Sequence, residues 1–133
     1  MQQLTFRLKP GQFLKEEIEK AANNKNIGAG VLLSVVGSLS MAVLRMAGAK
    51  PNEQSVNKYP GPFEIVSGTG TISRSGCHLH ISISDNKGNV IGGHLKDGCI
   101  VETTVEVVIG IFDDITYNRI PDQTTGFLEL SLE

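Results

Sequence analysis

Alternating apolar and polar residues predict that this chain is built mainly from β-strands. The alternation is clearest between Cys77 and Ser84, where the leucine and isoleucines fall on one side and the histidines and serines on the other. The apolar side predicts packing on a core, and the polar side predicts an accessible face. Other strand patterns occupy Leu4–Leu8, Val31–Val36, Met41–Met46, Phe63–Ser67, Gly70–Ser73, Val90–Ile91, Val101–Phe112 and Phe127–Leu132.

One segment repeats its apolar residues at helical spacing. Between Phe13 and Ala22 they recur three or four positions apart, with lysines and glutamates on the other side, and Asn23-Asn24 predicts the end of this helix. The prolines and glycines between Ala47 and Pro62 predict a loop with at most a short strand. Strands that follow one another without alternating helices predict an α+β fold with a mainly antiparallel sheet and one or two helices.

Length and composition narrow the class of protein. With 133 residues, the chain is expected to form a single domain over residues 1–133. Its net charge of −2 supplies no broad cationic surface for unaided binding to duplex DNA. The sequence opens without a signal-peptide pattern, and its longest apolar stretch, near Ala29–Val36, is far shorter than the ~20 residues of a membrane-spanning helix. We therefore expect a cytoplasmic protein without membrane contact, in which Cys77 and Cys99 stay reduced.

The three histidines of the chain are the strongest chemical signal. His78 and His80 stand two positions apart in a predicted strand, so both point to the same face, and His94 follows Gly92-Gly93. Three imidazoles with an open fourth position form one type of zinc site, and nickel, copper, cobalt or iron bind the same nitrogens. The alternative is that all three are exposed or hydrogen-bonded strand histidines without a metal.

Whether His94 joins the other two depends on the turn between them. A three-residue Asn86-Lys87-Gly88 loop, with glycine in the left-handed conformation, would pair Asp85 with Asn89 and place His80 directly opposite His94. A loop of two or four residues, or a bulge at Gly92-Gly93, would instead turn His94 to the other face. The expected site therefore carries a geometric condition.

Two acids and several serines could in principle take part in catalysis or orient a metal ligand. Glu106 or Asp97 could orient a ligating histidine or act as an acid or base, although Glu106 also fits the wet face of a half-buried strand. No serine lies in a Gly-x-Ser-x-Gly elbow, and the glycines near Gly68 lack the lysine of a phosphate-binding loop. The sequence therefore contains no recognisable catalytic triad.

Several short segments follow one another in a recognisable order along the chain. They are Gly37–Arg45, Gly61–Ser67 with Phe63 and Glu64, Gly70–Ile72, His78–His80, Asp85 with Gly88, Gly92-Gly93-His94 and Thr103–Glu106. Together they resemble the plant and prokaryote conserved (PPC) domain family over nearly the whole chain. The resemblance implies a compact α+β domain that assembles as a homotrimer, with a metal site at His78, His80 and His94 in the prokaryotic branch.

The plant relatives join this domain to AT-hook segments that bind DNA, and prokaryotic members are commonly described as predicted DNA-binding proteins. This chain contains no Arg-Gly-Arg-Pro hook, and Pro62 stands where plant members carry an arginine. The expectation that this chain binds DNA therefore rests on the resemblance alone.

Three functions follow as hypotheses. The first is a homotrimeric, non-enzymatic regulatory domain that carries zinc or another divalent transition metal and contacts DNA or a regulatory protein. The second is a metal-dependent enzyme that acts on a small molecule through His78, His80 and His94. The third is a metal-free scaffold for partner proteins.

Overall fold

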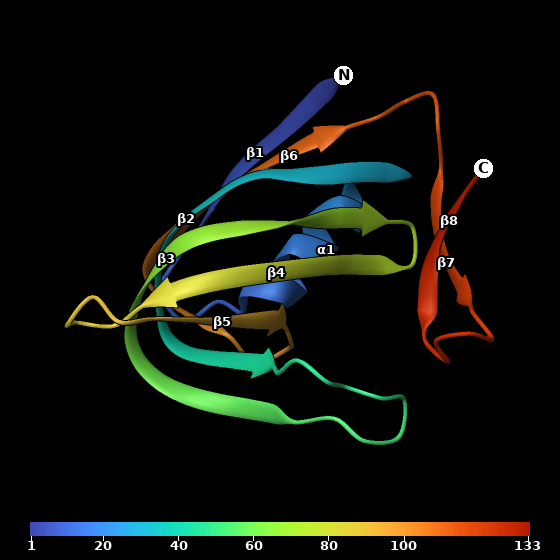
Figure 1. Ribbon diagram of the computed structural model, residues 1–133. Helices are drawn as coiled ribbons and strands as arrows, with labels where there is room; N and C mark the ends of the chain where they lie inside the picture. Colours follow the sequence, from blue (N-terminus) through green and yellow to red (C-terminus); the bar gives the residue numbers. More distant parts are fainter.

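The computed structural model describes residues 1–133 and contains eight β-strands and one α-helix (Figure 1). This agrees with the predicted α+β fold and its mainly antiparallel sheet. The strands are β1 (Gln2–Leu8), β2 (Ala29–Arg45), β3 (Val56–Ser73), β4 (Gly76–Ser84), β5 (Val90–Leu95), β6 (Ile100–Ile111), β7 (Tyr117–Pro121) and β8 (Leu128–Leu132), and the helix is α1 (Leu14–Asn24).

Six strands form one curled antiparallel sheet in the order β1-β6-β2-β3-β4-β5. The end of β2 also pairs with β5, through Leu44 opposite Leu95 and Arg45 opposite His94. This second pairing is reached because β2 and β3 curve strongly, which brings the end of β2 beside β5 (Figure 1). Residues at the end of β2 therefore meet the β4–β5 hairpin.

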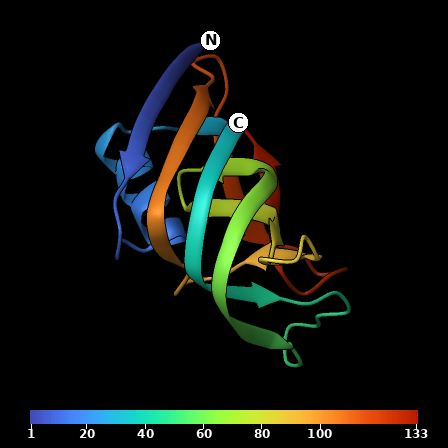
Figure 2. The ribbon, with the colours of Figure 1, turned by 90° about the vertical axis from the view of Figure 1, so that its left-hand side faces the viewer.

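The helix closes one side of this sheet. Its residues Leu14, Ile18 and Ala22 recur at four-residue spacing, are almost fully buried and belong to a single core cluster of 24 residues. Glu16 and Glu17 lie in the first turn, where negative charge favours the helix dipole. Figure 2 shows β6, β2 and β3 side by side across the front, with the helix behind β1 and β6 at the left.

Two predicted strands at positions 31–36 and 41–46 are a single strand. β2 runs without interruption from Ala29 to Arg45, and its register against β6 and β3 shifts at several points near Gly37–Met41. The segment between the two predicted strands, Gly37 to Ser40, is accommodated by these local irregularities, which bend a strand without ending it. The prediction of two strands was wrong for that reason.

The predicted loop from Ala47 to Pro62 is also shorter than expected. β3 already begins at Val56, runs through Pro60 and Pro62, and joins both strands predicted after them. Pro60 lies opposite Met41, at a register shift between β2 and β3, where a missing N–H group breaks no regular ladder. The prolines of this segment therefore did not indicate where the loop ends and β3 begins.

A separate hairpin of β7 and β8 stands at one end of the sheet (Figure 1). The sequence predicted β8 but not β7. Tyr117 ties this hairpin to the rest of the protein, since its N–H donates to the Gly28 carbonyl at 2.9 Å and its carbonyl accepts from Arg74 N–H at 3.2 Å.

The molecule's one helix is too short to cross a membrane.

Candidate metal centre

The turn between β4 and β5 has the predicted three-residue form. Asp85 N–H donates to the Asn89 carbonyl, Gly88 N–H donates to the Asp85 carbonyl, and Gly88 has a φ of +84°. The Asp85 carboxylate accepts the N–H groups of Lys87 and Asn89 at 2.9 Å each. These hydrogen bonds lower the pKa of Asp85 and hold the loop in this conformation.

The register of the hairpin follows from this turn. Ser84 pairs with Val90, Ser82 with Gly92, and His80 with His94, without a bulge at Gly92-Gly93. Because directly opposite residues share one face of a sheet, all three histidines lie on the same side. The geometric condition set by the sequence is met.

The two glycines before His94 allow β5 to lie between two strands. A Cβ atom on Gly92 would come within 2.7 Å of the Ile81 carbonyl oxygen of β4. A Cβ atom on Gly93 would come within 2.8 Å of the Arg45 carbonyl oxygen of β2. Glycine is therefore required at this point for His94 to meet both His80 and Arg45.

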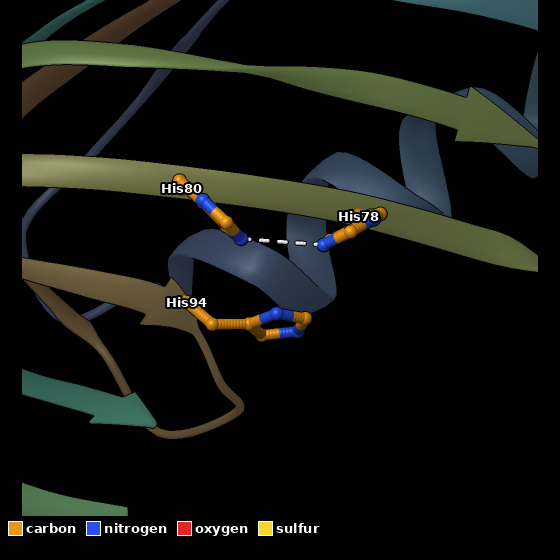
Figure 3. Close-up of side chains that lie close together, drawn as sticks. All are labelled: His78, His80 and His94. Atoms are coloured by element: carbon orange, nitrogen blue, oxygen red, sulfur yellow. Dashed lines mark hydrogen bonds between the residues drawn. The ribbon is translucent and has the colours of Figure 1, made fainter. Parts of the chain in front are cut away.

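The histidine rings converge on a common volume (Figure 3). Their centroids lie 4.8 to 5.3 Å apart, and one nitrogen from each ring lies within 4.8 Å of the others. The Nε2 atoms of His78 and His80 are 3.2 Å apart. Two nitrogens bound to zinc with tetrahedral geometry would be about 3.3 Å apart, so this pair already has the required spacing.

The widest nitrogen separation, 4.8 Å, exceeds that spacing by about 1.5 Å. A rotation of one imidazole about its side-chain torsions covers such a distance, since these terminal torsions are broad. Three imidazole nitrogen donors on one face fit a transition metal such as zinc.

Burial and nearby positive charge favour the neutral form of two of these imidazoles. Burial lowers the pKa of His94 to about 3, assisted by the positive charge of Arg45 and by His78. Burial also lowers the pKa of His78, with Arg119 and His80 acting in the same direction. Since only the unprotonated nitrogen binds a metal, these shifts reduce competition from protons.

Two arginines flank the three histidines. Nη2 of Arg45 lies 3.3 Å from Nδ1 of His94, and its guanidinium carbon sits 5.3 Å from the centroid of the Phe127 ring. Nη2 of Arg119 donates to Oγ1 of Thr71 at 2.8 Å, and Thr71 pairs with His78 across β3 and β4. An open cavity of about 420 Å³ adjoins His78, His94 and both arginines.

The two acids that were predicted to orient a ligating histidine, Asp97 and Glu106, do not contact the three histidines. Asp97 is largely exposed and accepts a hydrogen bond from Nζ of Lys15 at 3.1 Å. Glu106 is exposed on β6, which β2 and β3 separate from β4, and it pairs with Arg7 and Val36. Neither carboxylate is hydrogen-bonded to a histidine, so the expected role in orienting a ligand is not supported.

The remaining family-motif positions divide between site and scaffold. Arg45 belongs to the site, whereas Phe63 is buried in the core and Glu64 is exposed opposite Ser84. Cys77 and Cys99 are free thiols, as expected, and burial raises the pKa of the Cys77 thiol to about 12. Sequence reasoning missed Arg119, because it lies in the unpredicted strand β7.

Comparison with solved structures places this fold among known proteins. A hypothetical protein from Salmonella superposes with a TM-score of 0.92 at 33% identity, covering 99% of this chain and 93% of that one. A metal-containing protein from Archaeoglobus fulgidus superposes with a TM-score of 0.83 at 27% identity, covering 98% and 94% of the two chains. A candidate DNA-binding protein from Bacteroides thetaiotaomicron shares the fold, with a TM-score of 0.87 at 19% identity over 97% of this chain and 91% of that one.

Curated relatives carry the same domain within longer proteins. The bifunctional protein GlmU from a Synechococcus strain is 39% identical over 128 residues, which cover 96% of this chain and 20% of the relative. The chain therefore spans about a fifth of that protein's length. AT-hook motif nuclear-localized protein 13 from Arabidopsis thaliana is 28% identical over 116 residues, covering 80% of this chain and 26% of the relative.

A family profile matches most of the chain. The profile of the Plants and Prokaryotes Conserved (PCC) domain covers residues 1–113, which include the curled sheet, the helix and all three histidines. The match agrees with the resemblance carried by the sequence motifs. The chain therefore belongs to the Plants and Prokaryotes Conserved domain family.

Proposed function

We propose that this chain is a metal-binding domain in which His78, His80 and His94 hold one divalent transition metal, with zinc as the leading candidate. The observation that carries the proposal is the convergence of three imidazoles from one hairpin. The description of the Archaeoglobus relative as a metal-containing protein adds support.

Metal content tests this proposal directly. The purified protein should take up one equivalent of zinc, and His80→Ala should weaken binding at least about a hundredfold because it removes a ligand from a three-ligand site. Isothermal titration calorimetry and elemental analysis give the affinity and the stoichiometry. Zinc uptake by His80→Ala equal to that of the wild type would contradict the proposal.

Matched variants separate loss of a ligand from general damage. Thr69→Ala changes the residue directly opposite His80 on β3, and Asp97→Asn and Glu106→Gln change the two acids that lie away from the histidines. All three should bind zinc within about twofold of the wild type, since none removes a nitrogen donor.

We propose that the domain works as a homotrimer. Large apolar side chains remain exposed on the neighbouring strands β2 and β3, where Leu33, Val36 and Val66 are 50%, 49% and 57% exposed. Such residues favour burial against another copy of the chain. Light scattering should give a mass about three times 14.3 kDa, and Leu33→Ser with Val66→Ser should lower it. A wild-type mass of one chain would contradict the trimer.

We propose contact with DNA or a regulatory protein as the output of this assembly. Support comes from the descriptions of the Bacteroides and Arabidopsis relatives, while the net charge of −2 argues that one chain alone binds DNA weakly. Gel-shift measurements at low salt should detect a complex that is lost steeply as salt rises. Absence of any shift at low ionic strength would reject the DNA contact and leave a protein partner.

An alternative function for the same centre is metal-dependent chemistry on a small molecule. The observation that favours it is an open cavity of about 420 Å³ that His78 and His94 border. Turnover of a small-molecule substrate that persists in a His78→Ala/His80→Ala protein would reject this alternative.

A further inference from the structure

We infer that the cavity beside His78 and His94 binds a small molecule carrying a carboxylate or phosphate group, held by Arg45 and Arg119 and directed to the open coordination position of the metal. The inference rests on the proposed metal site. It names the class of ligand that such a site would accept.

The charges around this cavity favour an anion. Its lining contains four cations, of which Lys15 is already paired with Glu19 at 2.7 Å and with Asp97 at 3.1 Å. Arg45, Arg119 and Lys96 remain, and the other acid in the lining is Glu129. Positive charge is therefore concentrated at this cavity although the whole chain has a net charge of −2. A bound divalent metal would increase the positive charge further.

The two arginines approach the histidines from different strands. Arg45 lies opposite His94 across β2 and β5, while Arg119 is hydrogen-bonded to Thr71, the partner of His78. A planar guanidinium donates two parallel hydrogen bonds to a carboxylate or a phosphate. Two such groups beside one coordination site suit an anion that reaches the metal.

Metal binding changes what Arg45 can contact. In this structure its Nη2 group donates to Nδ1 of His94, which therefore accepts with its lone pair. If the metal binds Nδ1, that lone pair is used, and if it binds Nε2, the neutral ring carries its proton on Nδ1. The arginine loses its acceptor in both cases, and an anionic ligand would supply a new one.

The surroundings of Arg45 keep it at the cavity. The face of Phe127 lies 5.3 Å from its guanidinium carbon, so the side chain is held against a wall of the second hairpin. A cavity of about 420 Å³ lies in the range of small-molecule sites. Recessed cations of this kind suit a small ligand better than the extended backbone of duplex DNA.

Cobalt-loaded protein provides the test, because the visible absorption of Co²⁺ changes when a ligand enters its coordination sphere. Lactate and inorganic phosphate are titrated separately to distinguish the two anion classes, and glycerol serves as an uncharged control. At least one anion should produce a saturable change. Arg45→Gln and Arg119→Gln should each weaken its binding about tenfold or more, with unchanged cobalt stoichiometry.

Lys58→Gln is the matched control, since it removes an exposed positive charge of β3 that does not line the cavity. It should bind the anion as the wild type does. Equal anion affinity in wild type, Arg45→Gln and Arg119→Gln would overturn the inference, and so would the absence of any anion-dependent change in cobalt-loaded protein.

Failure of the metal site would be recognised separately. If the wild type takes up no cobalt, the proposed metal function fails, and anion binding is then measured on metal-free protein by calorimetry. Arginine-dependent binding there would support the anion site by itself. Its absence would overturn the inference as well.

Discussion

Two hairpins of this molecule border the same cavity, yet they differ in how they pair with other strands and in how deeply their side chains are buried. The β4–β5 hairpin is part of the large sheet and pairs with β3 on one side and β2 on the other. Its inward residues Leu79, Ile81 and Ile83 are at most 3% exposed. The β7–β8 hairpin forms its own two-stranded sheet, and its residues Leu128 and Leu130 are 59% and 42% exposed.

This difference matches what each hairpin contributes. Metal ligands must be held within a fraction of an ångström, and the more buried hairpin supplies the three imidazoles of the proposed metal site. Groups that contact a variable ligand tolerate more movement, and the more exposed hairpin supplies Arg119 and Phe127 to the proposed anion site. The family profile ends at residue 113, before the second hairpin, so its cavity-lining residues lie outside the profile.

The largest expected effect separates the hairpins by stability. Leu79→Ala should lower the free energy of unfolding by about 3 kcal/mol, because it leaves a cavity in the core, on the face of β4 opposite to His78 and His80. Leu130→Ala, measured at low protein concentration, should change the free energy of unfolding by less than about 0.5 kcal/mol, because this side chain is exposed on β8. Urea denaturation measures both values, and similar losses would contradict the comparison.

A smaller effect is expected at the turn that sets the register of the first hairpin. Gly88 has a φ of +84°, so Gly88→Ala should destabilise the protein by about 1 kcal/mol. Asn86→Ala, in the same loop, provides the control. Should Gly88→Ala unfold at the wild-type urea concentration, the left-handed turn is not a constraint on this hairpin.

A further expected effect is a dependence of stability on pH in the metal-free protein. The pKa of His94 is about 3 in the folded chain and about 6.5 in the unfolded chain, so between these values the unfolded state binds the additional proton. The free energy of unfolding should therefore fall as pH decreases below about 6.5. Above that value His94 adds no pH dependence.

Denaturation between about pH 7 and about pH 5 measures this slope in wild type and in His94→Asn. The asparagine variant should have the shallower slope, because it carries no titrating group at this position. Parallel curves would show that the environment of His94 does not depress its pKa.

The register of the first hairpin could be predicted, on condition of a three-residue loop without a bulge, because its signals are local. Asn86, Lys87 and Gly88 favour that loop, the alternation before it assigns His78 and His80 to one face, and the pairing across the loop adds His94. The approach of Arg45 could not be derived in this way. It depends on the curvature of β2 and on its second pairing with β5, which join residues far apart in the sequence.

The missed parts of the site have the same origin. β7 is only five residues long, and its Asn118 and Pro121 weaken any strand signal. Its position depends on contacts with Gly28, Thr71 and Arg74, which no local pattern encodes. Glu106 was placed on a strand correctly, but the order of strands in the sheet separates it from the histidines.

X-ray absorption spectroscopy at the zinc edge tests the central claim most directly. The zinc-loaded wild type should give a nitrogen or oxygen shell at about 2.0 to 2.1 Å, with outer-shell scattering from three imidazoles. A sulfur shell at about 2.3 Å, or scattering from fewer than three imidazoles, would contradict the claim that His78, His80 and His94 form one metal centre.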